Sequence, residues 1–261
     1  MKVLALHGLP TSPRLWERLQ LPPGWKLETP PIPGHGPEGT PDDWNLRATA
    51  ELVGPLNSGE EILVGHDLGG VLAAMIARPG QTVVLSGTAL GMYWTAIRLI
   101  AKDPLQRYFF ERHQGRRFIS QGSLPEHRDS LLEAFAEHGP GWGARMRVIA
   151  RGMKPPMMLA LRLRSCAVRL AWGRHDPWYP SWIAHTLKRT CGAKLFWLES
   201  GHFAPWEDPR GFADVITGAA LVDPTLVQQT LRWLQNMLKE CHPHRQHLQI
   251  HARRTKKHEK S

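Results

Sequence analysis

Short apolar runs alternate along this chain with segments long enough to form helices, and no other feature limits the possible folds as strongly. Each run is four or five residues long and is followed by Gly, Pro or a polar residue. Strands separated by helices are typical of βαβ units, which place the strands side by side in a parallel sheet. The predicted strands are Lys2–Leu6, Trp25–Thr29, Glu61–Gly65, Thr82–Leu85, Val168–Trp172 and Lys194–Leu198. We therefore expect an α/β fold with a mostly parallel sheet of about six strands.

The segments between the runs have the spacing of helices that flank such a sheet. In Asp42–Leu56 apolar residues recur at helical intervals, and Thr40 is the expected N-cap with Pro41 in the first turn. The other predicted helices of the core are Arg14–Leu19, Val71–Ala77, Ser181–Thr190 and Pro209–Gly218. A C-terminal amphipathic helix is expected within residues 223–240, over Pro224–Glu240.

Between Gly91 and Arg164 the alternation stops, and helical patterns follow one another with no strand between them. The predicted helices of this region are Met92–Ala101, Pro104–His113, Pro125–His138 and Trp142–Met153. We therefore expect an α/β core made of residues 1–90 and 165–222, with residues 91–164 inserted as an all-helical cap. Residues 241–261 are expected to be a basic, disordered tail.

Charge and cysteine content limit the class of protein. Eight Lys and Arg face three acidic residues from Asp223 onward, so about half of the net charge of +10 belongs to the last 39 residues. A solvated tail accounts for this charge better than nucleic-acid binding does. Cys166, Cys191 and Cys241 have no metal-ligand spacing, and no apolar run reaches the roughly 20 residues that span a membrane. We expect a cytoplasmic protein without membrane contact or bound metal.

Three turns carry candidate catalytic residues. The first reads Gly65-His66-Asp67-Leu68-Gly69-Gly70 and joins a predicted strand to a predicted helix. Glycines beside the central residue permit a sharp reversal, because a Cβ there would clash. The helix N-terminus favours a carboxylate, which makes Asp67 a candidate nucleophile. The alternative is that Asp67 only caps the helix.

Two further turns follow predicted strands and carry Asp176 and His202. They read Gly173-Arg174-His175-Asp176-Pro177 and Gly201-His202-Phe203. The carboxyl ends of parallel strands meet at one edge of a sheet, so both side chains are expected near Asp67. Taken alone, Asp176 is equally explained as a helix cap, and most of the fourteen His are expected at the surface. The order of nucleophile, acid and His is that of the α/β-hydrolase triad.

With these turns the chain resembles the α/β-hydrolase superfamily, and within it the aspartate-nucleophile branch of epoxide hydrolases and haloalkane dehalogenases. The other segments that carry the resemblance are His7-Gly8-Leu9-Pro10-Thr11-Ser12, Leu15-Trp16 and Pro33-Gly34-His35-Gly36. The resemblance covers about residues 2–220. It implies the α/β-hydrolase fold with a helical cap, and a core without the two strands that usually come first. A last helix or a partner subunit would cover the edge left by those strands, so an oligomer is possible.

The resemblance also implies a mechanism that needs neither a metal nor an organic cofactor. Asp67 would attack a carbon of a small-molecule substrate and form an ester, and His202, oriented by Asp176, would activate water to hydrolyse it. The backbone N–H groups of Leu9 and Leu68 would form the oxyanion hole. The expected substrate-binding residues are His7, His66, Tyr93 and Tyr108.

Departures from the family pattern bear on the substrate. Leu68 and Leu9 stand where haloalkane dehalogenases usually have Trp and Asn, whose N–H groups hold the halide, and Leu68 also replaces the Arg of fluoroacetate-type enzymes. Epoxide opening requires a proton donor, normally a pair of cap tyrosines. The candidate donors are Tyr93, Tyr108, Tyr179, His113 and His138. Elimination therefore favours epoxide hydrolysis over dehalogenation.

Two other classes of function remain open. A serine esterase would need Ser in a G-x-S-x-G turn, and Ser86-Gly87, which follows a predicted strand, lacks the preceding Gly. A non-catalytic relative would bind a small apolar ligand and keep the triad as a remnant. All three triad residues are of chemically competent types, which favours an enzyme.

Overall fold

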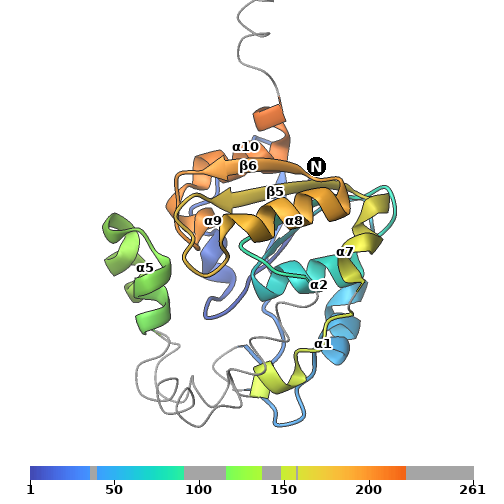
Figure 1. Cartoon of the computed structure of the whole chain (residues 1–261), viewed down its shortest axis with the longest axis horizontal. Coiled ribbons are helices and arrows are strands. Elements are labelled where there is room, and N and C mark those ends of the chain that lie inside the picture. The colour runs from blue at the N-terminus through green and yellow to red at the C-terminus, as the bar shows by residue number, and fades with distance from the viewer. Residues whose placement is uncertain (36–39, 91–115, 137–147, 157, 222–261) are drawn as a thin grey trace, which may run out of the picture. The chain divides into compact units, whose positions relative to one another are not determined.

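A computed structural model of the chain describes residues 1–35, 40–90, 116–136, 148–156 and 158–221 (Figure 1). The chain divides into two compact units, Met1–Thr217 and Gly218–Ser261. In the second unit the structure describes a short 3-10 turn, η6 (Ala219–Leu221). The account below concerns the first unit. Among the described residues, none of the helices has the length and apolar character needed to cross a membrane.

Six strands form one sheet in which every neighbouring pair is parallel. The strands are β1 (Lys2–Leu6), β2 (Lys26–Glu28), β3 (Ile62–His66), β4 (Thr82–Ser86), β5 (Ala167–Gly173) and β6 (Lys194–Leu198). Their order is β2-β1-β3-β4-β5-β6, so β1 and β3 to β5 are interior strands. In the register, Val3 lies opposite Ile62 and Leu63 opposite Val83. The predicted parallel sheet of about six strands is confirmed.

Helices connect the strands largely where the sequence predicts them. The elements before β5 are η1 (Pro13–Trp16), α1 (Leu46–Val53), η2 (Gly54–Leu56), α2 (Leu68–Ile76), η3 (Pro125–His127), α5 (Arg128–Ala134), α7 (Leu159–Arg162) and η5 (Leu163–Ser165). Those after it are α8 (Ser181–Cys191), α9 (Ala204–Glu207) and α10 (Pro209–Thr217).

The predicted start of α1 is wrong. The N-cap is Asn45, whose side-chain oxygen accepts the N–H of Ala48 over 2.8 Å. The hydroxyl of Thr40 instead donates to the carbonyl oxygen of Gly34 over 2.6 Å. Both residues are good N-caps. The Thr40 side chain is bonded within the preceding loop, and the Asn45 side chain caps the helix instead.

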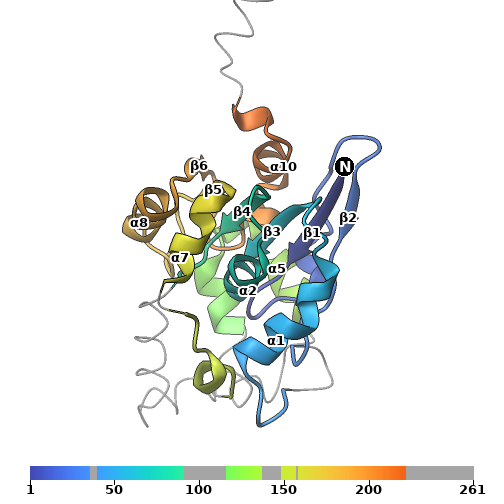
Figure 2. The same ribbon diagram turned by 90° about the vertical axis from the view of Figure 1, so that its right-hand side faces the viewer.

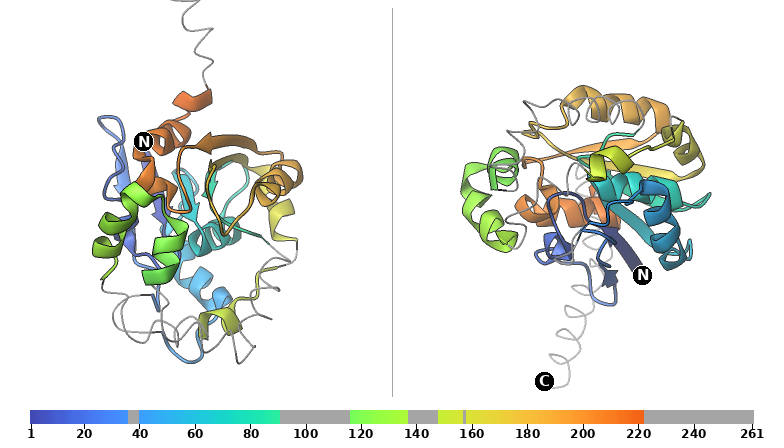
Figure 3. Two further views of the ribbon diagram at one scale, coloured as in Figure 1. Left: turned by 60° about the vertical axis from the view of Figure 1, so that its left-hand side comes forward. Right: turned by 90° about the horizontal axis from the view of Figure 1, so that it is seen from below.

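Alternation along the strands divides the core into two layers. In β1, Leu4 and Leu6 join the apolar cluster of α1, α2, α7 and α8, whereas Val3 and Ala5 join that of η1, α5, α9 and α10. Figure 2 shows α2 in front of the strands and α5 behind them. Figure 3 shows α5 beside α9 and α10 and away from α8, in agreement with the second cluster. Both faces of the sheet are therefore covered, as a parallel sheet requires.

The described parts of residues 91–164 contain helices and turns and no strand. Residues 116–122 and 148–152 are helical in addition to η3, α5, α7 and η5, and the first of these segments was not predicted. The predicted helices Met92–Ala101, Pro104–His113 and Pro224–Glu240 lie outside the described residues, as does the first half of Trp142–Met153. The boundaries of the cap and of the C-terminal helix stay predictions.

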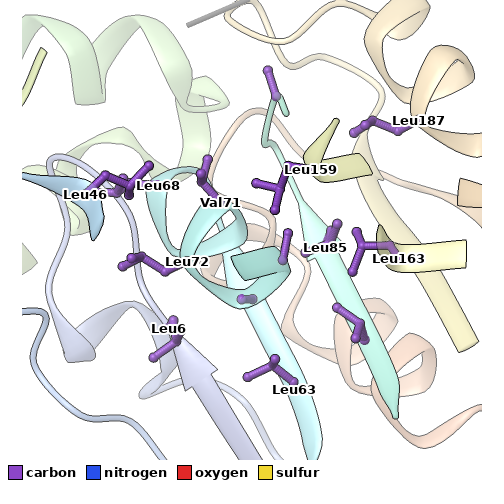
Figure 4. Packing of buried hydrophobic residues seen from close by; sticks show 14 of the residues in the cluster. Leu6, Leu46, Leu63, Leu68, Val71, Leu72, Leu85, Leu159, Leu163 and Leu187 are labelled. Atoms are coloured by element: carbon purple, nitrogen blue, oxygen red, sulfur yellow. The ribbon is translucent and has the colours of Figure 1, made fainter. Parts of the chain in front are cut away.

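The turn from β3 into α2 brings the helix against the neighbouring strand. A Cβ on Gly69 would overlap the carbonyl oxygens of Leu6 and His7, and a Cβ on Gly65 would overlap the backbone of Gly69 and Gly70. Figure 4 shows Leu68, Val71 and Leu72 of α2 among Leu6, Leu63 and Leu85 of the strands. Glycine is thus required where α2 begins, as the sequence predicts.

Gly69→Ala should lower the free energy of unfolding by about 3 kcal/mol or more, because interior backbone cannot move aside for the new methyl group. Gly24→Ala is the matched control. Its φ of +83° costs a side chain about 1–2 kcal/mol, but open space surrounds the Cβ position. Urea denaturation measures both. Equal losses in the two variants would contradict the close approach of α2 to β1.

Candidate active site

Asp67 stands at the junction of β3 and α2 with its carboxylate turned away from the helix. The backbone has φ +50° and ψ −117°, and Asp67 is the only non-glycine residue with positive φ in the part of the chain that is described. The side chain makes no capping bond to α2 although Asp67 is the N-cap residue. Asp67 therefore occupies the N-cap position, but its side chain does not cap the helix, contrary to the alternative interpretation.

Two donors from other parts of the chain hold the carboxylate of Asp67, a residue that is only 4% exposed. The backbone N–H of Leu9, in the loop after β1, donates to Oδ2 over 2.8 Å. The phenol of Tyr179, in the loop between β5 and α8, donates to Oδ1 over 2.6 Å. Leu68, whose N–H is the other predicted oxyanion donor, is the first residue of α2, so this N–H has no acceptor within the helix. The two carboxylate oxygens thus have different environments.

Asp176 and His202 form a buried pair. Oδ2 of Asp176 lies 3.0 Å from Nδ1 of His202, and both side chains are almost fully buried. Oδ1 of Asp176 accepts the N–H groups of Trp178 and Tyr179 over 2.9 and 3.0 Å. Asp176 is not the N-cap of α8, which is Pro180. Asp176 therefore orients the imidazole and fixes the turn that carries Tyr179, which excludes the alternative of a helix cap.

The loop of His202 is fixed by buried polar groups. Its N–H donates to the carbonyl oxygen of Gly122 over 2.6 Å, and its carbonyl oxygen lies 2.9 Å from Nε2 of His66. The Glu207 carboxylate accepts the N–H groups of Gly201 and Phe203 on either side of His202, over 2.7 and 3.2 Å. Nε2 of His202 has no hydrogen-bond partner among the described residues, which leaves it available as a base.

The imidazoles of His66 and His202 are neighbours, with ring centres 4.6 Å apart, but their pKa values shift in opposite directions. Burial alone would lower the pKa of His202, but the charge and hydrogen bond of Asp176, with the charges of Asp67 and Glu207, outweigh burial and raise it above 6.5. Burial, then the charge of His202, lowers the pKa of His66 well below 6.5. His66 is therefore neutral, and its Nε2–H donates to the backbone of His202.

The predicted substrate-binding residues have different outcomes. Tyr93 and Tyr108 lie outside the described residues, as do the alternative donors His113 and His138. His7 is 1% exposed, and its Nε2 accepts the N–H of Ile32 over 3.2 Å. His7 and His66 thus both bond to backbone around the site. Among the described residues, no three His, Cys, Asp or Glu side chains are grouped as metal ligands.

The sequence names Tyr179 only as a candidate proton donor for epoxide opening and does not predict its contact with Asp67. Tyr179 is 4% exposed, its ring lies against that of His202 at 5.4 Å, and its carbonyl oxygen accepts the indole N–H of Trp172 over 2.8 Å. The available signal was its place three residues after Asp176, within reach of a turn that an Asp side chain closes.

Asp176→Asn should lower the pKa of His202. The amide keeps an oxygen for the turn but removes the charge that outweighs burial. An NMR titration of His ring carbons measures the change. Asp214→Asn, which removes an equal charge from an exposed position on α10, should leave this pKa unchanged. An unchanged pKa in Asp176→Asn would contradict the electrostatic pairing of Asp176 with His202.

Comparison with known proteins places this geometry in a family. Residues 3–215 match the family described as "Alpha/beta hydrolase family". A pimeloyl-[acyl-carrier protein] methyl ester esterase of Aromatoleum aromaticum is 35% identical over 79 residues, 29% of this chain and 31% of that protein. Lipase LipV of Mycobacterium tuberculosis is 33% identical over 91 residues, 32% of this chain and 35% of that protein. The chain thus matches about a third of the length of each of these curated relatives.

Solved structures agree on the fold. An esterase of Thermogutta terrifontis has a TM-score of 0.65 and 20% identity, with 84% of this chain and 89% of that chain covered. The enol-lactonase of Burkholderia xenovorans has a TM-score of 0.62 and 14% identity, with 85% and 91% covered. At this identity the likeness shows the fold alone, and the predicted α/β-hydrolase fold is confirmed. The family match over residues 3–215, together with this fold, shows that the chain belongs to the alpha/beta hydrolase family.

Proposed function

We propose that this protein hydrolyses a small organic electrophile, in the first place an epoxide, through an ester of Asp67. The observation that carries the proposal is the Asp67 carboxylate, which stands at the turn into α2 without capping the helix. An oxygen nucleophile of this kind displaces a leaving group from an sp³ carbon. The proposal places the chain in the aspartate-nucleophile branch of its family.

In the first step Oδ1 of Asp67 attacks an epoxide carbon and the carbon–oxygen bond of the ring breaks. Oδ2, which accepts the Leu9 N–H, becomes the carbonyl oxygen of the ester. The ring oxygen takes up a proton on the side of the carbon opposite to Asp67, because the displacement is in line. We propose Tyr93 or Tyr108 of the cap as this donor, with His113 or His138 as alternatives.

In the second step Nε2 of His202 takes a proton from water, and the hydroxide adds to Cγ of Asp67. The negative charge then develops on Oδ2 beside the N–H of Leu9, with that of Leu68 as the second donor. Each such donor is worth about 3 kcal/mol in the transition state. Collapse of the intermediate releases a diol. Asp176 holds His202 in place, and we propose that His7 and His66 position this machinery through backbone contacts.

We also propose that residues 91–164 act as the cap of the site. The described part of this region already contacts the base. The ring of Phe118 lies 4.4 Å from that of Trp178 and 6.0 Å from that of His202, and Gly122 accepts the His202 N–H. Apolar rings around the site favour an apolar substrate and keep bulk water from the ester.

Hydrolysis of an ester or lactone is the second candidate, favoured by the esterase and lipase among the relatives. Its chemistry is less favourable here, because a carboxylate that displaces an alkoxide from an ester forms an anhydride. A serine nucleophile would need a hydroxyl bonded to His202. The buried hydroxyls of Ser86, Ser123 and Ser200 have no hydrogen-bond partner among the described residues. Turnover of a p-nitrophenyl ester that survives Asp67→Ala would favour the second candidate.

In water labelled with ¹⁸O, one turnover of 1,2-epoxypropane by excess protein should give unlabelled diol. The water oxygen should enter Asp67, because hydroxide adds to Cγ and the original Oδ1 leaves with the product. Mass spectrometry measures the ¹⁸O label in the diol and in the peptide that contains Asp67. Asp67→Ala should abolish turnover, whereas Asp214→Asn should not. Label in the first diol would show direct attack by water, and binding without turnover would show a non-catalytic relative.

The rate of ester breakdown should fall as the pH drops through the pKa of His202, because only the neutral imidazole takes a proton from water. Esterification removes the charge of Asp67, which helps to raise this pKa in the free protein. The acid limb of ester breakdown should therefore lie at lower pH than the His202 pKa of the free protein. Rapid-quench measurements of the rate of ester breakdown across the pH range locate this acid limb. A rate independent of pH down to pH about 5 would contradict a base of the His type.

A further inference from the structure

The phenol of Tyr179 contacts Oδ1 of Asp67. In the second step of the proposed mechanism this oxygen is the leaving atom. This inference rests on the proposed function. Leu9 holds Oδ2 of Asp67, so Oδ1 is the oxygen that attacks the substrate and becomes the ester oxygen. The phenol of Tyr179 lies 2.6 Å from Oδ1. One lone pair of Oδ1 accepts this hydrogen bond, and another remains for the substrate carbon.

The bond that breaks in the second step joins Cγ to Oδ1. Oδ1 leaves with the product as an alkoxide, which needs a proton. We propose that Tyr179 is a catalytic acid that donates its phenolic proton to Oδ1 as this bond breaks. A phenol is a stronger acid than an aliphatic alcohol, so the transfer to a departing alkoxide is favourable.

The protons balance without any further reactant. His202 takes one proton from water, the hydroxide adds to Cγ, and Tyr179 gives its proton to the alcohol product. Asp67 is then a carboxylic acid next to a phenolate, and its proton passes to Tyr179, which restores the hydrogen bond of the resting structure. The proton on His202 returns through solvent to the group that protonated the epoxide oxygen.

The surroundings of Tyr179 fit an acid that works together with the base. Asp176 accepts the Tyr179 N–H with one oxygen and holds His202 with the other, so one carboxylate sets the positions of both groups. The indole N–H of Trp172 holds the carbonyl oxygen of Tyr179, and the Tyr179 ring lies against that of His202 at 19°. The backbone N–H and the backbone carbonyl oxygen of Tyr179 are thus both hydrogen-bonded, and its ring packs against His202.

The same hydrogen bond allows a rival role, in which Tyr179 only restrains Asp67 until a substrate displaces the phenol. Tyr179 cannot serve as the acid of the first step, because the epoxide oxygen leaves on the side of the carbon away from Oδ1. The two roles differ in the step that they affect. An acid speeds ester breakdown, whereas a restraint slows ester formation.

The test is Tyr179→Phe, which keeps the ring against His202 and removes only the hydroxyl. With 1,2-epoxypropane, intact-protein mass spectrometry after rapid quench gives the rates of ester formation and breakdown. We expect breakdown to slow by about 100-fold or more, with formation changed only a few-fold, so that the ester accumulates. With 3,3,3-trifluoro-1,2-epoxypropane, which releases a more acidic alcohol, the loss should be smaller. A merely structural role of Tyr179 would not produce this dependence on the leaving group.

His202→Gln separates the two proposals, because it should trap the ester whatever the role of Tyr179. No ester in His202→Gln with either epoxide would overturn both the proposed function and the acid role. An ester in His202→Gln, with breakdown at the native rate in Tyr179→Phe, would overturn the acid role alone. Faster formation with native breakdown in Tyr179→Phe would identify the restraint instead. Fluorotyrosine at position 179 is the second variant, and it should retain at least the native rate of breakdown.

Discussion

The backbone of Asp67 is held at φ +50°, and the geometry of the site depends on the groups that hold it there. L residues rarely adopt this conformation, which persists only where the surroundings fix it. The Asp67 N–H donates to the carbonyl oxygen of Ser86, and its carbonyl oxygen accepts the Thr88 hydroxyl over 2.7 Å. These bonds tie the turn to the end of β4. The carboxylate is thereby kept off the helix and directed to the donors of two other loops.

Charge in this site is buried and is compensated by specific bonds. Each oxygen of Asp67 and of Asp176 accepts at least one hydrogen bond. Glu207 accepts three backbone N–H groups, which oppose the effect of burial, but burial is the larger effect and raises its pKa. Gly87 leaves room for Asp176 and His202, since a Cβ there would lie 3.0 Å from the His202 ring. The raised pKa of His202 and the lowered pKa of its neighbour His66 follow from this arrangement rather than from residue type.

The inserted region takes part in the site through its backbone. Gly122 accepts the N–H of His202, and the N–H of Leu124 donates to Glu207 over 3.2 Å. The loop that carries His202 is therefore bonded to the segment inserted between β4 and β5. A change in that segment has a direct route to the position of His202, which links the proposed cap to the chemistry of the core.

The sequence alone determined the six strands, the sharp turn at Asp67 and the order of Asp67, Asp176 and His202. These features rest on local rules: apolar periodicity selects strands, and steric overlap selects Gly65 and Gly69. Only the tertiary structure decided that Tyr179 reaches Asp67 across 112 residues, that Glu207 lies under the His202 loop, and that Asn45 rather than Thr40 begins α1. The contacts of Tyr179 and Glu207 depend on how loops that follow different strands meet, and no local pattern encodes the distance between them. The choice of N-cap depends on the Thr40 side chain, which bonds to the carbonyl oxygen of Gly34.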